Sequence, residues 1–262
     1  MGLLNAVYRV ASFLGMPFYL RYLESVVKEG PIPKHVALIL DGNRRFAIKR
    51  NLSWLEGYRV GANKTKELLA WLLDLGIEHV TLFAFSTENF KRPKDQVEAV
   101  FKAMEEKLLE LKENINTLRE KEVSFRVVGR KEMLPERIRS IAEEMEASTS
   151  GFSKTLNLAI AYGGRAEIVD AVRKIARKVK EGALDPDEID DDVIRMHLYA
   201  PDLPDPDLII RTSGEERLSN FLLWQSAYSE LYFCEVYLPE LRKVDLLRAI
   251  RDYQRRKRRF GS

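Results

Sequence analysis

The sequence has little of what disulfide or zinc chemistry requires. It contains one cysteine, Cys234, and three histidines in 262 residues. An intramolecular disulfide is therefore impossible, and no Cys/His cluster has the spacing of a zinc site. A single cysteine also fits a reducing compartment. Any bound metal should then be a hard cation held by oxygen ligands.

The chain also lacks a strong excess of either charge and a long apolar run. Its 43 basic and 40 acidic residues leave a net charge of +3, which is too balanced to argue for nucleic acid as a partner. No apolar stretch approaches the ~20 residues that span a membrane. The first 28 residues lack a basic leader and a small-residue cleavage site, so we expect no signal peptide. These absences favour a cytoplasmic protein, with membrane association left open.

What is present is the composition of an ordinary globular protein, with 45% hydrophobic and 32% charged residues. Residues 1–30 place apolar clusters between scattered charges. This pattern predicts an N-terminal amphipathic helix that either packs on the body or lies on a membrane surface. Pro31-Ile32-Pro33 then separates this helix from the body. We therefore expect one large domain over residues 31–262, with a core that needs no disulfide.

Short apolar runs alternate with helical stretches through this domain. The apolar runs are residues 36–40, 80–85, 123–128, 155–161, 208–211 and 231–236. Helical periodicity or composition covers residues 60–75, 93–121, 135–148, 165–180, 187–197 and 244–258. The alternation predicts an α/β fold with a mainly parallel six-stranded sheet flanked by helices. In such sheets, ligands bind beyond the carboxyl ends of the strands.

Polar clusters follow three of the predicted strands. Residues 41–46 combine Asp41, a glycine and two arginines before a helical stretch, which suits a metal-bound phosphate. A helix cap is the structural alternative for Asp41. Residues 86–93 could also form a cap before a helix that starts with proline. Residues 211–221 place two arginines and several hydroxyls in a glycine-containing loop, which indicates a second anion site.

Four segments resemble the cis-prenyltransferase family, which includes undecaprenyl and dehydrodolichyl diphosphate synthases. They are HVALILDGNRRF (35–46), TLFAFSTENFKRP (81–93), NLAIAYGGR (157–165) and LIIRTSGEERLSNFLLWQSAYSELYF (208–233). The likeness runs from about residue 33 to residue 261. The N-terminal helix and the Arg44-Arg45 pair are more similar to archaeal and eukaryotic members than to bacterial ones.

This resemblance implies a reaction. Residues 31–262 would be a catalytic domain that condenses isopentenyl diphosphate with an allylic diphosphate, geranylgeranyl or farnesyl diphosphate, in a magnesium-dependent reaction. The product would be a long polycis-polyprenyl diphosphate, the precursor of a glycosyl carrier lipid. The enzyme would be a homodimer, with possible peripheral membrane contact as an expectation. Prenyl transfer to a different acceptor, or a short product, is the alternative on the same site.

The resemblance also implies residue roles. Asp41 would be a catalytic magnesium carboxylate, Asn89 would help remove the proton, and Glu230 would be the second magnesium carboxylate, reaching across the dimer. The allylic side would comprise Gly42, Asn43, Arg44, Arg45, Phe46, Tyr58, Ser86, Thr87, Glu88, Phe90 and Arg92. The isopentenyl side would comprise Arg211, Arg217, Leu218 and Ser219, with Arg259 and Gly261 of the C-terminal Arg-x-Gly completing the site of the other subunit.

A growing apolar product implies an apolar tunnel. Phe46 and Phe90 would border it, and its expected walls, for each of which plain core packing is the alternative, are Ala84, Phe85, Val97, Val100, Phe101, Met104, Leu108 and Leu111. Two positions depart from the family pattern. Trp54 stands where many members have arginine, so Arg50 or Arg59 would have to replace that phosphate contact. Tyr58 stands where many have histidine, and a tyrosine, with a pKa of ~10, would orient groups rather than carry protons, so its role is left open here.

Other classes of protein fit less well. A non-catalytic subunit of this family should have lost Asp41, the arginine-rich loop or Glu88-Asn89, and all of these are present. A nucleotide-binding protein with a similar sheet would need a P-loop, and none occurs. An all-helical trans-prenyltransferase would need a DDxxD motif, and Asp190-Asp191-Asp192 is followed by residues that do not fit it.

Overall fold

The computed structural model describes residues 2–256, with side chains from residue 16 onward. Six strands form one sheet in the order β3-β4-β2-β1-β5-β6, and each neighbouring pair is parallel. The strands are β1 His35–Ile39, β2 His79–Ser86, β3 Val123–Val128, β4 Lys154–Tyr162, β5 Leu208–Arg211 and β6 Glu230–Phe233. The expected single α/β domain is confirmed, and its sheet is parallel throughout the described part of the chain.

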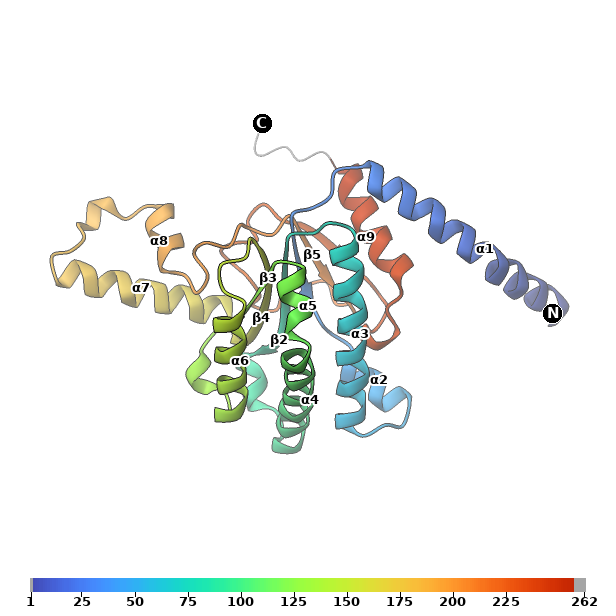
Figure 1. Cartoon of the computed structure of the whole chain (residues 1–262), viewed down its shortest axis with the longest axis horizontal. Coiled ribbons are helices and arrows are strands. Elements are labelled where there is room, and N and C mark those ends of the chain that lie inside the picture. The colour runs from blue at the N-terminus through green and yellow to red at the C-terminus, as the bar shows by residue number, and fades with distance from the viewer. Residues whose placement is uncertain (1, 257–262) are drawn as a thin grey trace.

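Helices cover the sheet (Figure 1). They are α1 Gly2–Glu29, α2 Asn43–Lys49, α3 Trp54–Asp74, α4 Lys94–Glu113, α5 Ile115–Glu120, α6 Glu136–Ser148, α7 Gly164–Lys180, α8 Asp191–His197 and α9 Lys243–Arg255. Helices α3, α4 and α6 lie next to one another in front of the sheet, whereas α7 and α8 extend to one side. Short 3-10 turns, among them η1 Thr87–Lys91 and η4 Leu238–Glu240, connect strands to helices.

The central strand β1 explains why the polar clusters meet. All five of its residues are buried, as expected for an apolar run between two sheet neighbours. It pairs with β2 and β5 so that Ile39 lies opposite Phe83 on one side and Arg211 on the other. The loops that follow these three strands therefore leave the same edge of the sheet. Within the described part of the chain, the residues predicted to bind phosphates lie at the ends of these strands, in these loops or in the helices that follow them.

Several predicted element bounds need correction. The single helix expected over residues 93–121 is two helices, because the backbone changes direction at Asn114, whose side-chain amide donates to the carbonyl of Glu110 at 2.8 Å. Helix α3 starts at Trp54 rather than near residue 60, because Ser53 and Glu56 form a capping box. The helix expected over residues 187–197 begins only at Asp191, after the Asp190 side chain caps the N–H of Val193.

The N-terminal helix is present as α1, and it packs along α9 near its own C-terminal end. Leu23 and Val27 are fully buried, and the Gln254 amide donates to the carbonyl of Val27 at 2.8 Å. Phe18 and Tyr22 instead expose 74% and 65% of their surface. Within the described residues, none of the helices combines the length and the hydrophobicity needed to cross a bilayer.

Candidate active site

A cavity of about 930 Å³ begins at the carboxyl edge of the sheet and continues beneath α3 and α4. One end is lined by the charged side chains Asp41, Arg44, Arg45, Arg92, Arg211 and Arg217. The middle is apolar, lined by residues that include Leu69, Leu82, Phe85, Val100, Met104, Leu108 and Leu111. The far end reaches Glu78, next to the start of β2, and Lys121, just after α5. The cavity therefore suits a molecule with an anionic head and a long apolar tail.

Asp41 is fixed at the charged end by bonds from the loop after β5. Thr212 Oγ1 accepts from the Asp41 N–H at 2.9 Å and donates to the Asp41 carbonyl at 2.6 Å. The Gly42 N–H donates to Asp41 Oδ1 at 2.6 Å. Gly42 has φ 103°, and a Cβ there would lie 2.9 Å from Cα of Tyr237, so only glycine fits this turn. The carboxylate is thus held with Oδ2 facing the arginines.

Asp41 remains ionised at neutral pH. Partial burial raises the pKa of its carboxyl, but the Arg211 guanidinium, the Gly42 N–H and Arg45 together bring the pKa below its ordinary value. Arg211 Nη2 donates to Asp41 Oδ2 at 2.8 Å, and Arg45 Nη2 lies 3.5 Å from the same oxygen. The side chain of Arg211 is only 5% exposed. A carboxylate bound this way is available as an anionic ligand over the whole physiological pH range.

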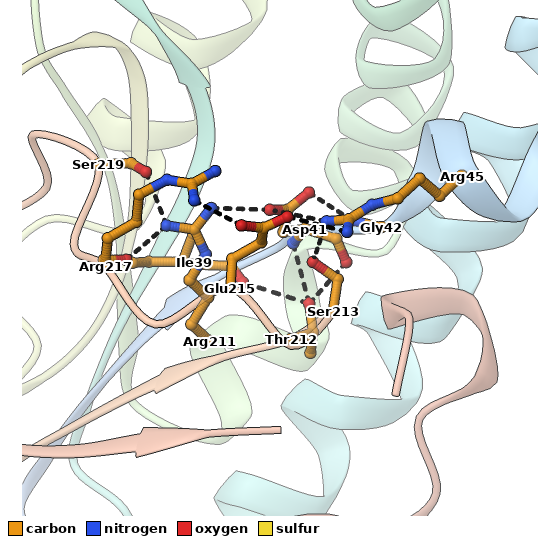
Figure 2. Close-up of polar contacts among 10 residues, drawn as sticks. All are labelled: Ile39, Asp41, Gly42, Arg45, Arg211, Thr212, Ser213, Glu215, Arg217 and Ser219. Carbon is orange, nitrogen blue, oxygen red and sulfur yellow. Dashed lines mark hydrogen bonds and ion pairs between the residues drawn. The ribbon is translucent and has the colours of Figure 1, made fainter. Parts of the chain in front are cut away.

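Figure 2 shows three arginines converging on this point from two segments of the chain. Arg45 donates to Ser213 Oγ at 2.6 Å and to Glu215 Oε1 at 3.0 Å. Arg217 donates to the other oxygen of Glu215. Arg211 donates to Ser219 Oγ at 2.6 Å and to the main-chain carbonyl of Arg217. Guanidinium groups placed together in this way form a site for phosphate oxygens.

Two further arginines explain the departures at Trp54 and Tyr58. The guanidinium of Arg44 lies 5.6 Å from the centre of the Trp54 ring, a cation–π contact. Arg92 Nη1 lies 3.5 Å from the Tyr58 hydroxyl. Burial raises the pKa of Tyr58 above its ordinary value, which keeps the hydroxyl protonated. Both aromatic residues therefore orient arginines at the cavity entrance.

The two arginines considered as replacements for the missing phosphate contact are engaged elsewhere. Arg50 pairs with Glu240 at 3.0 Å, and Arg59 forms a bidentate pair with Glu106. Neither arginine lines the cavity. The structure therefore gives no support to Arg50 or Arg59 as substitutes, and it leaves Arg44 as the arginine that Trp54 positions.

The turn η1, after β2, contributes a polar wall. Asn89 Oδ1 accepts from the Ser86 N–H at 3.2 Å, and both residues line the cavity. Glu88 Oε1 accepts from Asn220 Nδ2 at 2.7 Å. Burial raises the pKa of Glu88, but hydrogen bonds from its own main chain and from Asn220 lower it by more. The pKa of Glu88 is therefore below its ordinary value. Glu88 is therefore an anion beside the site, although it does not line the cavity itself.

Not every residue expected at the tunnel lines it. Phe46 is a buried residue of α2, and Phe90 packs edge-on against Phe85 with ring centres 4.9 Å apart. The expected site and tunnel residues that do not line the cavity are Phe46, Thr87, Glu88, Phe90, Val97, Phe101, Leu218 and Glu230. The expected residues that do line it are Gly42, Asn43, Arg44, Arg45, Tyr58, Ala84, Phe85, Ser86, Asn89, Arg92, Val100, Met104, Leu108, Leu111, Arg211, Arg217 and Ser219. Arg259 and Gly261 lie outside the described residues.

Residues that sequence reasoning missed hold these loops together. Asn220 Oδ1 accepts from the Arg165 N–H at the start of α7 at 2.8 Å, and its carbonyl accepts from the Gly164 N–H at 2.7 Å. Asn220 also has a left-handed φ of 66°, which asparagine tolerates well. The sequence motifs also assign no role to Glu215, Ser213 or Thr212. The signal that was available is the position of these residues in the predicted anion loop, between or beside Arg211 and Arg217.

Magnesium fits this site only if a substrate diphosphate shares its coordination with the protein. The described residues contain no group of three His, Cys, Asp or Glu side chains close enough to bind a metal ion. Mg²⁺ is usually held by one or two carboxylates together with substrate phosphates and water. Asp41, ionised and 32% exposed at the side chain, can supply one such carboxylate. The fit is therefore to a cation that arrives with a diphosphate.

Glu230 lies at the opposite edge of the sheet in the same chain. It begins β6 beside Leu208, whereas Arg211 near Asp41 lies beside Phe233. Three residues of strand separate these levels by about 10 Å. The Glu230 carboxylate accepts from Arg256 Nη1 at 2.7 Å. Glu230 and Asp41 of one chain are therefore not assembled into a common metal site.

The fold and the site together define a class of protein. It is a parallel α/β protein whose cavity offers arginines to an anionic head at the carboxyl edge of the sheet and apolar side chains to a tail beneath α3 and α4. The sequence matches the Prenyltransf family model, described as undecaprenyl diphosphate synthase, over residues 39–261.

Known relatives agree with this match. The chain is 57% identical over 244 residues to a tritrans,polycis-undecaprenyl-diphosphate synthase (geranylgeranyl-diphosphate specific) of Methanopyrus kandleri, covering 93% of this chain and 90% of that protein. It is 49% identical over 261 residues to the enzyme of the same name from Pyrococcus abyssi, covering 99% and 98%. The crystal structure of lavandulyl diphosphate synthase from Lavandula x intermedia, in complex with dimethylallyl diphosphate, superposes with a TM-score of 0.84 at 38% identity, covering 88% of this chain and 99% of that one.

The chain belongs to the undecaprenyl diphosphate synthase family of cis-prenyltransferases. It is a transferase of the cis-polyprenyl type, which elongates an allylic diphosphate with isopentenyl diphosphate.

Proposed function

We propose that the enzyme elongates geranylgeranyl diphosphate, with Mg²⁺ bound at Asp41, into a long polycis-polyprenyl diphosphate that becomes a glycosyl carrier lipid. The observation that carries this proposal is the cavity, which joins a cluster of arginines to an apolar channel that continues to the far edge of the sheet. The choice of primer follows from the archaeal relatives, since those proteins are described as specific for geranylgeranyl diphosphate.

The departing diphosphate is the group that the allylic side must stabilise. Breaking the allylic C–O bond increases the negative charge on the leaving oxygen, and Arg44, Arg45 and Arg92 supply positive charge at that end of the cavity. Stabilisation that increases in the transition state is what accelerates the reaction. Mg²⁺ would add Lewis-acid stabilisation of the leaving diphosphate when bound at Asp41.

The isopentenyl diphosphate is held on the other side of Asp41. Arg211, at the end of β5, and Arg217 and Ser219, in the loop that follows, all line the cavity there. Two anion sites on adjacent loops place the double bond of one substrate beside the reacting carbon of the other, which removes most of the entropic cost of their encounter. Asn89 lines the same region and is our candidate for helping to remove the proton, whereas the protonated Tyr58 hydroxyl orients Arg92.

A short product or a different acceptor is the second candidate. The structural similarity to lavandulyl diphosphate synthase favours retaining this second candidate. That protein has the same fold, and its name gives lavandulyl diphosphate as the product rather than a polyprenyl diphosphate. The length of the apolar channel favours the long product. Reverse-phase chromatography of the products separates the two possibilities.

We also propose that the active form is a homodimer. Strand β6 is an edge strand of the sheet, and all four of its residues are partly exposed. Because Glu230 lies away from Asp41 in its own chain, a role as a magnesium ligand would require it to reach the site of a second copy. Light scattering after gel filtration should give twice the chain mass, and a monomer that is fully active would contradict the proposal.

Peripheral membrane contact is proposed for α1. Phe18 and Tyr22 are exposed on this helix, and the product that it would help deliver is a lipid. Co-sedimentation with anionic vesicles should fall when both residues are replaced by serine. Equal co-sedimentation of the wild type and the double serine variant would exclude this role. The cytoplasmic location stays a prediction.

One set of parallel incubations tests the main proposal. Radiolabelled isopentenyl diphosphate is supplied with geranyl, farnesyl or geranylgeranyl diphosphate, with Mg²⁺ or with EDTA. We expect long products, fastest from geranylgeranyl diphosphate, and none in EDTA. Full activity in EDTA would contradict the role of the metal, and equal rates from all three primers would contradict the proposed specificity.

A further inference from the structure

Glu215 occupies an unusual position in the charged end of the cavity. Its two carboxylate oxygens bind two different arginines, Arg45 at 3.0 Å through Oε1 and Arg217 through Oε2 (Figure 2). Arg45 belongs to the allylic side of the proposed site, and Arg217 belongs to the isopentenyl side. One carboxylate therefore joins the two anion sites.

The backbone keeps Glu215 in this place. The Ser213 N–H donates to the carbonyl of Val236 and the Gly214 N–H donates to the carbonyl of Cys234, both at 2.9 Å. Ser213 and Gly214 have left-handed φ values of 80° and 74°, so the loop turns sharply just before Glu215. The side chain of Glu215 is 28% exposed. A tethered backbone and a flexible, partly exposed side chain allow the carboxylate to move while its loop stays in place.

A diphosphate and the Glu215 carboxylate compete for the same donors. Phosphate oxygens that bind Arg45 or Arg217 need the N–H groups that Glu215 now accepts from. Two anions that share a small site also repel each other. The Arg217 guanidinium further lowers the pKa of Glu215, so the carboxylate does not avoid this repulsion by taking up a proton near neutral pH.

We propose that Glu215 is an internal substitute for substrate phosphate, which pairs with Arg45 and Arg217 in the free enzyme and returns to them as pyrophosphate leaves. Glu215 is thus a positioning residue that lowers the affinity of the enzyme for pyrophosphate and speeds its release. This inference rests on the proposed assignment of Arg45 and Arg217 as diphosphate ligands. It differs from a purely structural role, because loss of a structural residue should weaken binding, whereas loss of a competitor should strengthen it.

Glu216 provides a matched control. It is the next residue in the loop, it is exposed, and replacement by glutamine removes the same charge. Any effect of net charge alone on anion binding should therefore appear in both E215Q and E216Q. The partly exposed Glu215 pairs are of a kind that contributes modestly, so we expect an effect of roughly three- to tenfold in the pyrophosphate dissociation constant.

The test is calorimetric titration of the full chain with magnesium pyrophosphate, using the wild type, E215Q, E216Q and R45Q. We expect E215Q to bind about three- to tenfold more tightly than E216Q, and its steady-state inhibition by pyrophosphate to strengthen by a similar factor. Binding by E215Q that equals or falls below that of E216Q would overturn the inference. If R45Q binds as tightly as the wild type, the proposed diphosphate site is itself wrong, which is a distinct result.

Discussion

Single residues in this site act by joining segments that are far apart in the sequence. Asp41 is bonded to Arg211 and Thr212, about 170 positions later in the chain, and Asn220 connects η1 with the start of α7. The motifs predicted which residues gather at the sheet edge, because parallel strands end there together. They could not predict these pairings, because each depends on the register between strands and on a rotamer choice within a loop.

The first prediction concerns Asn220. Replacement by alanine removes the bonds to Glu88 and to the Arg165 N–H, and it places alanine at a left-handed φ of 66°. We expect the free energy of unfolding to fall by about 2 kcal/mol, from two hydrogen bonds and backbone strain. Turnover at saturating substrate should fall at least about tenfold. Urea denaturation and steady-state kinetics measure the two effects.

A glycine at this position separates backbone from side chain. N220G accepts the left-handed conformation but makes neither side-chain bond, so its turnover should stay low even though the strain is relieved. If N220G turns over like the wild type, the side chain of Asn220 does not position the site.

At the level of elements, α3 and α4 form one wall of the cavity, and they are joined by polar side chains, of which Lys66, Lys107 and Glu110 also line the cavity. Glu110 of α4 accepts from Lys66 of α3 at 2.6 Å and from Lys107 of its own helix. Lys107 also donates to Asn63 of α3 at 2.7 Å. The sequence predicted both helices from their composition and periodicity. It did not predict the break at Asn114, because one asparagine among many polar residues gives no distinct signal that a helix ends there.

The second prediction is a pH dependence at Glu110. Its bonds to Lys107 and Lys66 lower the pKa of the carboxyl from 4.5 to about 2. Because the pKa is lower in the folded state, the stabilisation is complete above about pH 4.5 and is lost as the pH falls towards 2. The wild type should exceed E110Q in unfolding free energy at pH 7 by less than about 1 kcal/mol, since the carboxylate is partly exposed. The difference should shrink below pH 4.

The exposed Glu113 of α4 offers the control. The unfolding free energy of E113Q, measured in urea, should equal that of the wild type at every pH from 7 to 3. A difference between E110Q and the wild type that is unchanged from pH 7 to pH 3 would show that Glu110 does not connect the helices electrostatically.

The third prediction concerns the length of the channel. Ala103 of α4 is buried and lines the cavity between its charged and far ends. Phenylalanine there would fill part of the channel, so the growing chain should stop earlier and the products should shorten. Chromatography of products from one primer measures this. An unchanged product length at normal protein stability would mean that the chain follows another path.

At the scale of the whole molecule, the parallel sheet places charge at one edge and an apolar channel beneath the helices that cover one face. The fold class was predictable because six apolar runs alternate with helical segments, and all six strands are present. The order of the strands was not predictable in the same way. Glu230 lies at the amino edge, away from Asp41, because it is the first residue of the parallel strand β6, and this position is why a second copy enters the proposed function.

The most direct test of the account is a crystal structure with Mg²⁺, isopentenyl diphosphate and an unreactive thio analogue of geranylgeranyl diphosphate. We predict one diphosphate at Arg44 and Arg45, the other at Arg211 and Arg217, the metal at Asp41, and the prenyl tail beneath α3 and α4. Density for the two diphosphates away from these arginines, or a tail outside the channel, would contradict the account.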